Sequence, residues 1–95
     1  MARPKKLNQQ EIEEALKKLP RWRLSEGAIR RTFQFDDFVH AIAFVNKLAE
    51  AAEAAQHHPD IDIRYNKVRL ALISHDAGGL TTKDFAIAAG ADHLA

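Results

Sequence analysis

The chain has 95 residues and a mass of 10.7 kDa, which is enough for one domain with a single modest core. Its composition is that of an ordinary globular protein, and the absence of cysteine excludes disulfides, thiol nucleophiles and thiolate metal sites. The formal charge of +1 gives no reason to expect a strongly anionic partner. Since no basic stripe alternates with exposed aromatic residues, we predict that no nucleic acid binds.

The first six residues are basic, and we expect them to form a flexible tail on a single domain that spans residues 1–95. No apolar run follows this tail, so we expect no secretory signal. No segment is apolar for long enough to form a transmembrane helix. The sequence therefore predicts a cytoplasmic protein without a membrane partner.

The predicted elements begin with a helix over residues 8–19. Asn8 can cap its start, Glu11 completes a capping box three residues later, and Pro20 ends the helix. A short strand at 21–24 and a longer strand at 29–35 follow. Alternate residues of the longer strand share one face: Ile29, Arg31, Phe33 and Phe35.

A long second helix is predicted to begin at Asp36 or Asp37, either of which can cap it, and to end before Pro59. Its apolar residues cover more than one face, so we expect it to contact its own sheet and also a second subunit. Because the residue before a proline is pushed out of helical geometry, His57 should lie on the last turn and His58 just beyond it, with diverging rings.

Two more strands are predicted at 61–65 and 68–75, joined by a hairpin turn at Asn66-Lys67. After a flexible loop at 76–79, Thr81 can cap a third helix in a box with Asp84. The predicted fold class is α+β in the order α-β-β-α-β-β-α. Hairpins separated by helices indicate a four-stranded antiparallel sheet with the three helices packed on one face.

Three histidines carry most of the chemistry that the sequence offers. Imidazole is the side chain that can give and take protons near neutral pH, and His57 and His58 stand side by side. Glu53 lies four residues before His57 on the same helix face, so we expect these two side chains to pair. His75 lies at a sheet rim where loops gather, and it can converge with the other two. The cluster predicts proton-transfer chemistry or a metal site.

Two other interpretations of this cluster stay open. The histidine pair can simply end a helix, with Glu53 and His57 as an ordinary surface pair and Asp84 as a helix cap. Three histidines can also hold a catalytic zinc, with Glu53 or Asp84 behind them. Adjacent histidines at a helix end point in different directions, unlike two histidines four residues apart, so we expect no metal. His40 and His93 show no local pattern and are expected on the surface.

The cluster belongs to a longer motif of seven positions: Glu53, His57, His58, Pro59, Tyr65, His75 and Asp84. With this spacing the sequence closely resembles the pterin-4a-carbinolamine dehydratases, also called 4a-hydroxytetrahydrobiopterin dehydratases. The resemblance covers nearly the whole chain from the first helix onward. It includes Trp22 near the first strand and the segments at 33–38, 65–68 and 75–84.

The resemblance implies an enzyme that dehydrates 4a-hydroxytetrahydrobiopterin, or a related 4a-hydroxytetrahydropterin, to quinonoid dihydropterin and water. Such a reaction recycles the pterin cofactor of aromatic amino-acid hydroxylases, which implies a functional link to such a hydroxylase. Water leaves C4a while a proton leaves N5, so one group must donate a proton and another must accept one. Imidazoles can do both without a metal or an organic cofactor, and none is expected.

Residue roles follow from the same resemblance. The catalytic residues would be His57, His58 and His75, with His58 as the acid at the 4a-hydroxyl and either of the other two as the base at N5. The substrate-binding residues would be Glu53, Asp84 and Trp22. The two carboxylates would orient imidazoles or bind polar edges of the pterin, and the tryptophan would form part of the pocket wall. Tyr65 would serve packing.

The family also implies an alternative without turnover. Animal members act as dimerisation cofactors for a homeodomain transcription factor through a helix surface, and relatives with a degraded site act as assembly chaperones. The intact histidines favour the enzyme. In either case we predict a homodimer or homotetramer, because two-fold pairing would cover exposed sheet edges and the apolar face of the long helix.

Overall fold

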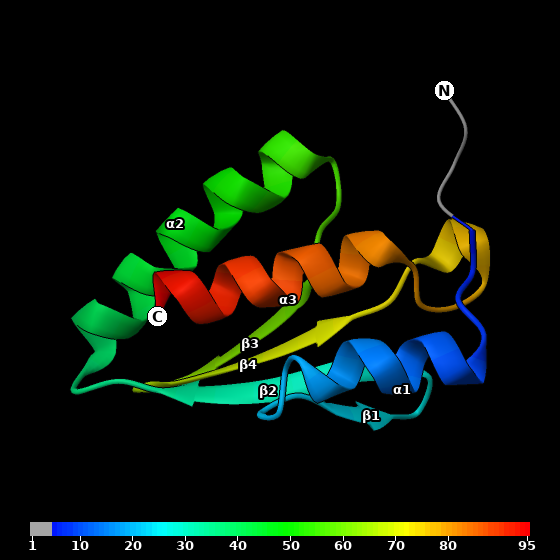
Figure 1. The fold of residues 1–95 in the computed structure, drawn as a ribbon. Helices are drawn as coiled ribbons and strands as arrows, with labels where there is room; N and C mark the ends of the chain where they lie inside the picture. Colours follow the sequence, from blue (N-terminus) through cyan, green and yellow to red (C-terminus); the bar gives the residue numbers. More distant parts are fainter. Residues whose placement is uncertain (1–4) are drawn as a thin grey trace.

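The computed structural model describes residues 5–95, and Figure 1 shows the helices covering one face of a sheet. The elements in chain order are α1 (Gln9–Lys17), β1 (Arg23–Ser25), β2 (Ala28–Gln34), α2 (Phe38–Ala55), β3 (Asp60–Arg64), β4 (Lys67–Leu72), the 3-10 turn η1 (His75–Ala77) and α3 (Thr82–Leu94). The sheet order is β1-β2-β4-β3, with every pair antiparallel. This confirms the predicted α+β fold. Residues 1–4 of the predicted basic tail lie outside the described part of the chain.

The helix starts follow the predicted caps. Asn8 and Glu11 form a capping box at α1, and the side chain of Asp37 accepts from the His40 N–H at α2. Helix α1 ends at Lys17 rather than just before Pro20. The chain tightens there into successive three-residue turns, in which the N–H of Lys18 donates to the carbonyl of Ala15 at 3.2 Å.

The core lies between the sheet and the helices. Strand β4 alternates buried and outward residues, which gives the period of two that one covered face requires. Phe33 of β2 contacts Phe44 of α2, with ring centroids 4.8 Å apart. The largest fully buried apolar side chains come from β2, β4, α2 and the segment just before α3: Ile29, Leu48, Val68, Leu70, Leu72 and Leu80.

The β3–β4 hairpin turns one residue earlier than predicted. Arg64 pairs with Lys67, so the turn consists of Tyr65 and Asn66, and the predicted Asn66-Lys67 turn is wrong. Tyr65 adopts a left-handed φ of 53° and is 67% exposed. Asn66 is fixed to β2, since its side-chain amide donates to the carbonyl of Phe35 at 2.9 Å and its own carbonyl accepts from the Phe35 N–H. These two bonds to β2 fix Asn66 in the turn and so set the register of the β3–β4 hairpin.

Strand β3 forms an edge of the sheet. Its residues Ile61 and Ile63 pair with Leu70 and Val68 and therefore share their helix-facing side, yet both remain exposed. Among residues 5–95, none of the helices is both long and apolar enough to cross a lipid bilayer.

Candidate active site

Helix α2 ends in a left-handed turn that places both motif histidines beyond the helix. Gln56 has φ 53° and ψ 41°, its N–H donates to the carbonyl of Glu53, and the N–H of His57 donates to that of Ala52. This pair of bonds is the Schellman closure. The expectation that His57 lies on the last helical turn is therefore wrong, and its distance from Glu53 is no longer set by helical spacing.

His57 pairs with Asp84, which lies in the first turn of α3. Its Nε2 is 2.6 Å from the carboxylate oxygen Oδ1, and the two side chains are 12% and 0% exposed. The two residues are 27 positions apart in the chain. Asp84 therefore has a role beyond capping its helix, because it holds an imidazole from another element in a nearly dry contact.

The Asp84 carboxylate is itself fixed by two groups, one on each side of the η1 turn. Its Oδ2 accepts from the Ser74 hydroxyl at 2.8 Å and from the Thr81 N–H at 2.9 Å. The hydroxyls of Ser74 and Thr81 are 2.9 Å apart, so the network is closed. The start of α3 adds the favourable field of a helix N-terminus. Buried polar groups that are satisfied in this way form a rigid arrangement.

His58 pairs with Glu53, although the sequence predicted that Glu53 would pair with His57. Nε2 of His58 is 2.9 Å from Oε2 of Glu53, and the two side chains are 61% and 73% exposed. The physical reason is the left-handed Gln56, which turns the chain so that the second histidine returns over the last helical turn. This pair lies in solvent, so its energetic contribution is that of a surface pair.

The two pairs have the same chemical form. A carboxylate accepts at the Nε2 of each imidazole, so the Nε2 hydrogen points at Asp84 in one case and at Glu53 in the other. In a neutral imidazole held this way, Nδ1 is the nitrogen that accepts a proton. Both rings are thus oriented for proton transfer through Nδ1.

His75 begins the 3-10 turn η1 and is exposed. The turn is closed at its base, because Ser74 and Gly79 exchange backbone hydrogen bonds of 3.0 and 3.2 Å. Ser74 also donates to Asp84, so the residue next to His75 is tied directly to the carboxylate that holds His57. The backbone thereby brings the third motif histidine to the same end of the sheet, as predicted.

Trp22 lies in the core. It is buried against Phe33, with ring centroids 6.1 Å apart, and its indole N–H donates to Asp92 near the end of α3 at 2.8 Å. Asp84 lies near the start of the same helix, so the tryptophan and the His57 pair occupy different ends of α3. A pocket-wall role for Trp22 stays a prediction. Sequence reasoning missed Asp92, which also binds Arg31.

Sequence reasoning also missed Ser74, although a signal was available. The alternation of β4 puts Ser74 on the same side as the buried Leu70 and Leu72. A polar residue at such a position needs a buried partner. His40 and His93 are both exposed, as predicted. Within residues 5–95, no group of three histidine or acidic side chains is arranged to hold a metal ion.

Comparison with known sequences identifies a family for this arrangement. Residues 5–94 match the model of the family described as pterin 4 alpha carbinolamine dehydratase. A protein of Acidobacterium capsulatum named "Putative pterin-4-alpha-carbinolamine dehydratase" is 63% identical over 83 residues, which cover 87% of this chain and 90% of that protein. A protein of Gloeobacter violaceus whose name differs only by a final 2 is 61% identical over 88% of this chain and 96% of its own length.

Solved structures of proteins described as pterin dehydratase or pterin dehydratase-like share the fold of this chain. The crystal structure of a transcriptional coactivator/pterin dehydratase from Brucella melitensis superposes with a TM-score of 0.92 at 35% identity, over 95% of this chain and 98% of that one. A pterin dehydratase-like protein described as a RuBisCO assembly factor in the alpha-carboxysome gives 0.65 at 26% identity, over 77% of this chain and 87% of that one.

Proposed function

The chain belongs to the pterin 4 alpha carbinolamine dehydratase family, and we propose that it catalyses the dehydration for which this family is named. The substrate is a 4a-hydroxytetrahydropterin. The C4a–O bond breaks, the departing hydroxyl takes up a proton and leaves as water, and N5 loses a proton to give the quinonoid dihydropterin. The observation that carries the proposal is the pairing of two adjacent imidazoles with two separate carboxylates.

We assign the base at N5 to His57. Its ring is held by a fully buried carboxylate, which stabilises the imidazolium that forms when Nδ1 takes the N5 proton. Ser74 and Thr81 keep that carboxylate in place, so little reorganisation accompanies the proton transfer. In this scheme Asp84 is a positioning residue that acts through His57.

We assign the acid at the 4a-hydroxyl to His58. This ring is exposed and is oriented by the exposed Glu53, so it can regain a proton from solvent after each turnover. His75 is the third residue of the proposed catalytic trio. It follows Ser74, whose hydroxyl donates to Asp84, and it remains the alternative base at N5. The contact of Trp22 with substrate stays a prediction, because its indole binds Asp92 at the other end of α3 from the His57 pair.

A turnover assay with synthesised 4a-hydroxytetrahydropterin tests the proposal. The protein should accelerate dehydration well beyond the rate in buffer, and His58→Ala should remove most of that acceleration. His93→Ala is the matched control, because His93 is an exposed histidine outside the motif. Wild-type protein that gives no rate above buffer would refute the enzymatic proposal.

Metal independence is a second expectation of the same scheme. Imidazoles can supply both the acid and the base, so activity should survive dialysis against a chelator, with clearly less than one zinc bound per chain. If chelation abolished the activity and added zinc restored it, the proton-transfer scheme would give way to metal-assisted chemistry. No organic cofactor is required by the scheme.

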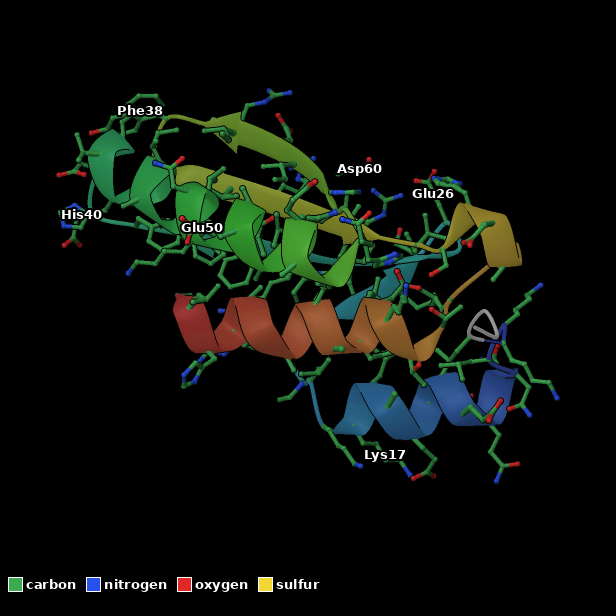
Figure 2. All side chains as sticks on the ribbon, turned by 90° about the horizontal axis from the view of Figure 1, so that it is seen from above. Lys17, Glu26, Phe38, His40, Glu50 and Asp60 are labelled. Carbon is green, nitrogen blue, oxygen red and sulfur yellow. The ribbon has the colours of Figure 1, made fainter. Side chains whose placement is uncertain are left out.

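A second candidate function is binding of a protein partner. The start of α2 exposes Phe38 and Val39 to 49% and 73%, which is unusual for large apolar side chains next to each other. Figure 2 places Phe38 at the end of α2 away from Asp60, so this surface is separate from the end that carries the histidine pair. The names of the Brucella and carboxysome proteins, a coactivator and an assembly factor, favour such a role.

We propose that this surface and the exposed edge of β3 are used first by further copies of the chain, as a homodimer or homotetramer. Light scattering at micromolar concentration should give a multiple of 10.7 kDa. Val39→Glu should reduce the mass, whereas Glu50→Gln, a change on the same helix, should not. A wild-type mass of one chain that persists on concentrating would refute the oligomer.

A further inference from the structure

The face of the sheet opposite the helices carries a hollow of about 580 Å³ with a strongly basic lining. The lining residues come from β1, β2 and β4 and from the segment before β1: Arg21, Arg23, Ser25, Glu26, Arg30, Arg31, Thr32 and Arg69. Arg31 is neutralised by Asp92 on the other side of the sheet, so four arginines against one glutamate leave three positive charges in this hollow, whereas the whole chain has a formal charge of only +1. The positive charge is therefore concentrated at this place.

The sheet register forces three of these arginines together. Arg23 and Arg30 are direct cross-strand partners on β1 and β2. Arg30 lies opposite Ala71, so Arg69, two residues earlier on β4, is its diagonal neighbour on the same face. Like charges in directly opposed positions destabilise a sheet. Because the opposed Arg23 and Arg30 do not help the sheet to fold, their presence suggests another role. A bound anion would offset the repulsion between them.

These guanidinium groups are available to a ligand. Within residues 5–95, none of Arg23, Arg30 and Arg69 forms an ion pair with a carboxylate. Asp62, the cross-strand partner of Arg69, instead contacts Arg64 at 3.5 Å. The Nε of Arg30 donates to the carbonyl of Ser25 at 3.1 Å, which fixes the group, and its terminal nitrogens have no hydrogen-bond partner among residues 5–95.

Arg31 does not belong to this set. Its side chain lies on the helix side of the sheet, where it binds Asp92 and its guanidinium carbon lies 4.0 Å from the centre of the Phe33 ring. The contrast between neighbours in β2 is informative. Arg31 has a carboxylate and an aromatic ring as partners, whereas in the described part of the chain the guanidinium of Arg30 has only a backbone carbonyl.

We propose that this hollow is a binding site for a small ligand that carries a diphosphate or similar polyphosphate group. Guanidinium groups bind phosphate oxygens in a bidentate manner, and three of them around one anion would cancel their mutual repulsion. The volume of about 580 Å³ lies within the usual range for small-molecule sites. The lining includes none of the motif histidines or their carboxylates, so the site is additional to the proposed dehydratase centre.

The observations favour a small anion over a nucleic acid. Asp60 and Asp62 of the adjoining strand β3 lie on the same face, and Glu26 lines the hollow at the turn between β1 and β2. A polyanion long enough to extend beyond the hollow would therefore meet carboxylates. Figure 2 shows Glu26 and Asp60 toward the same end of the molecule. The lining also contains no aromatic side chain on which a base could stack.

Titration calorimetry with inorganic diphosphate tests the proposal, at fixed ionic strength and with sulfate as the reference anion. Diphosphate should bind once per chain and more tightly than sulfate. The Arg23→Gln/Arg69→Gln variant should weaken diphosphate binding at least about tenfold, as expected for lost charge-assisted bonds. Lys47→Gln removes a positive charge from the exposed side of α2 and should change the affinity less than about twofold.

Thermal unfolding gives an independent readout. In low-salt buffer without anion, Arg23→Gln should raise the unfolding temperature, because it removes one of two opposed charges. Added diphosphate should stabilise the wild type and stabilise this variant less. Equal diphosphate affinity in the double variant and in Lys47→Gln would overturn the site. A single-stranded oligonucleotide that binds more tightly than diphosphate at the same salt would overturn the assignment to a small ligand.

Discussion

The pairs His57–Asp84 and His58–Glu53 both join an imidazole Nε2 to a carboxylate, but the first pair is buried and the second is exposed to solvent. His57 and Asp84 form a nearly dry pair whose carboxylate is held by a hydroxyl and a backbone N–H. His58 and Glu53 form their pair in solvent. Losing one partner of a buried pair leaves a charge or a polar group without water, whereas a surface pair simply rehydrates. The buried pair should therefore support both fold and chemistry, and the exposed pair chemistry alone.

The largest expected effect is that of Asp84→Asn. The amide cannot accept from the imidazole, the Ser74 hydroxyl and the Thr81 N–H together, so we expect a loss of about 2–4 kcal/mol in the free energy of unfolding. Turnover should fall by about 10²-fold or more because His57 loses its orientation. The matched change Glu53→Gln should cost less than about 1 kcal/mol. Urea denaturation and initial rates measure both. Equal stability losses in the two variants would contradict the comparison.

The next effect separates chemistry from stability at the exposed histidines. His58→Ala and His75→Ala should each lower turnover by about 10²-fold or more, as expected for a lost acid or base. Their thermal midpoints should stay within about 5 °C of the wild type, because changes at exposed positions cost under about 1 kcal/mol. Calorimetric unfolding together with the rate assay checks this. A large loss of stability with little change in rate would mean that these histidines are structural.

A smaller effect is expected for Ser74→Ala. The change removes one donor to Asp84 and leaves the His57 contact in place, so about 1 kcal/mol of stability should be lost. Turnover should fall only several-fold, since His57 keeps its contact with a carboxylate that has lost one of its two supports. Ser25→Ala, in the β1 edge strand, serves as the control. An unchanged rate of turnover would confine Ser74 to a structural role.

The smallest effect concerns a third pair, Asp37 and His40, at the start of α2. The hydrogen bond from the backbone N–H of His40 lowers the pKa of Asp37, and the hydrogen bond to Asp37 raises the pKa of His40 above its ordinary value. The histidine therefore stabilises the fold below pH 6.5, and this contribution is lost as pH rises through the raised pKa. The aspartate stabilises the fold above pH 3.8, and its contribution is lost as pH falls through the lowered pKa.

An NMR titration of the His40 ring measures this pair directly. The midpoint should lie above the ordinary value for histidine in the wild type and return toward it in Asp37→Ser, which retains a capping hydroxyl but removes the charge. A wild-type midpoint at or below the ordinary value would contradict the assigned direction. Because both side chains are exposed, the effect on overall stability should be small.

The fold could be predicted from local sequence signals. Three helix starts were marked by capping residues, and the alternation of β2 and β4 gave the buried face. The hairpin turn was placed one residue late because Tyr65 has the side chain of a strand residue. Its left-handed backbone is imposed by the contacts of Asn66 with β2, which a local pattern does not contain.

The sequence motif named the two histidines and two carboxylates that pair in the structure, but it did not predict which of them pair. The motif spacing identified the histidines and both acidic residues, but helical spacing assigned Glu53 to the wrong imidazole. Gln56 carries no sequence signal for a left-handed conformation, since glycine is the usual residue there. The Ser74 and Asp92 contacts bridge segments far apart in the chain, so only the tertiary structure reveals them.

The central claim is that carboxylate-held imidazoles transfer the protons of a pterin dehydration. The rate of dehydration of synthesised 4a-hydroxytetrahydropterin, measured for the wild type and for His57→Ala under single-turnover conditions, tests it most directly. We predict a wild-type rate far above that in buffer and a loss of about 10²-fold or more in the variant. A wild-type rate equal to that in buffer, or a folded His57→Ala variant as fast as the wild type, would contradict the account.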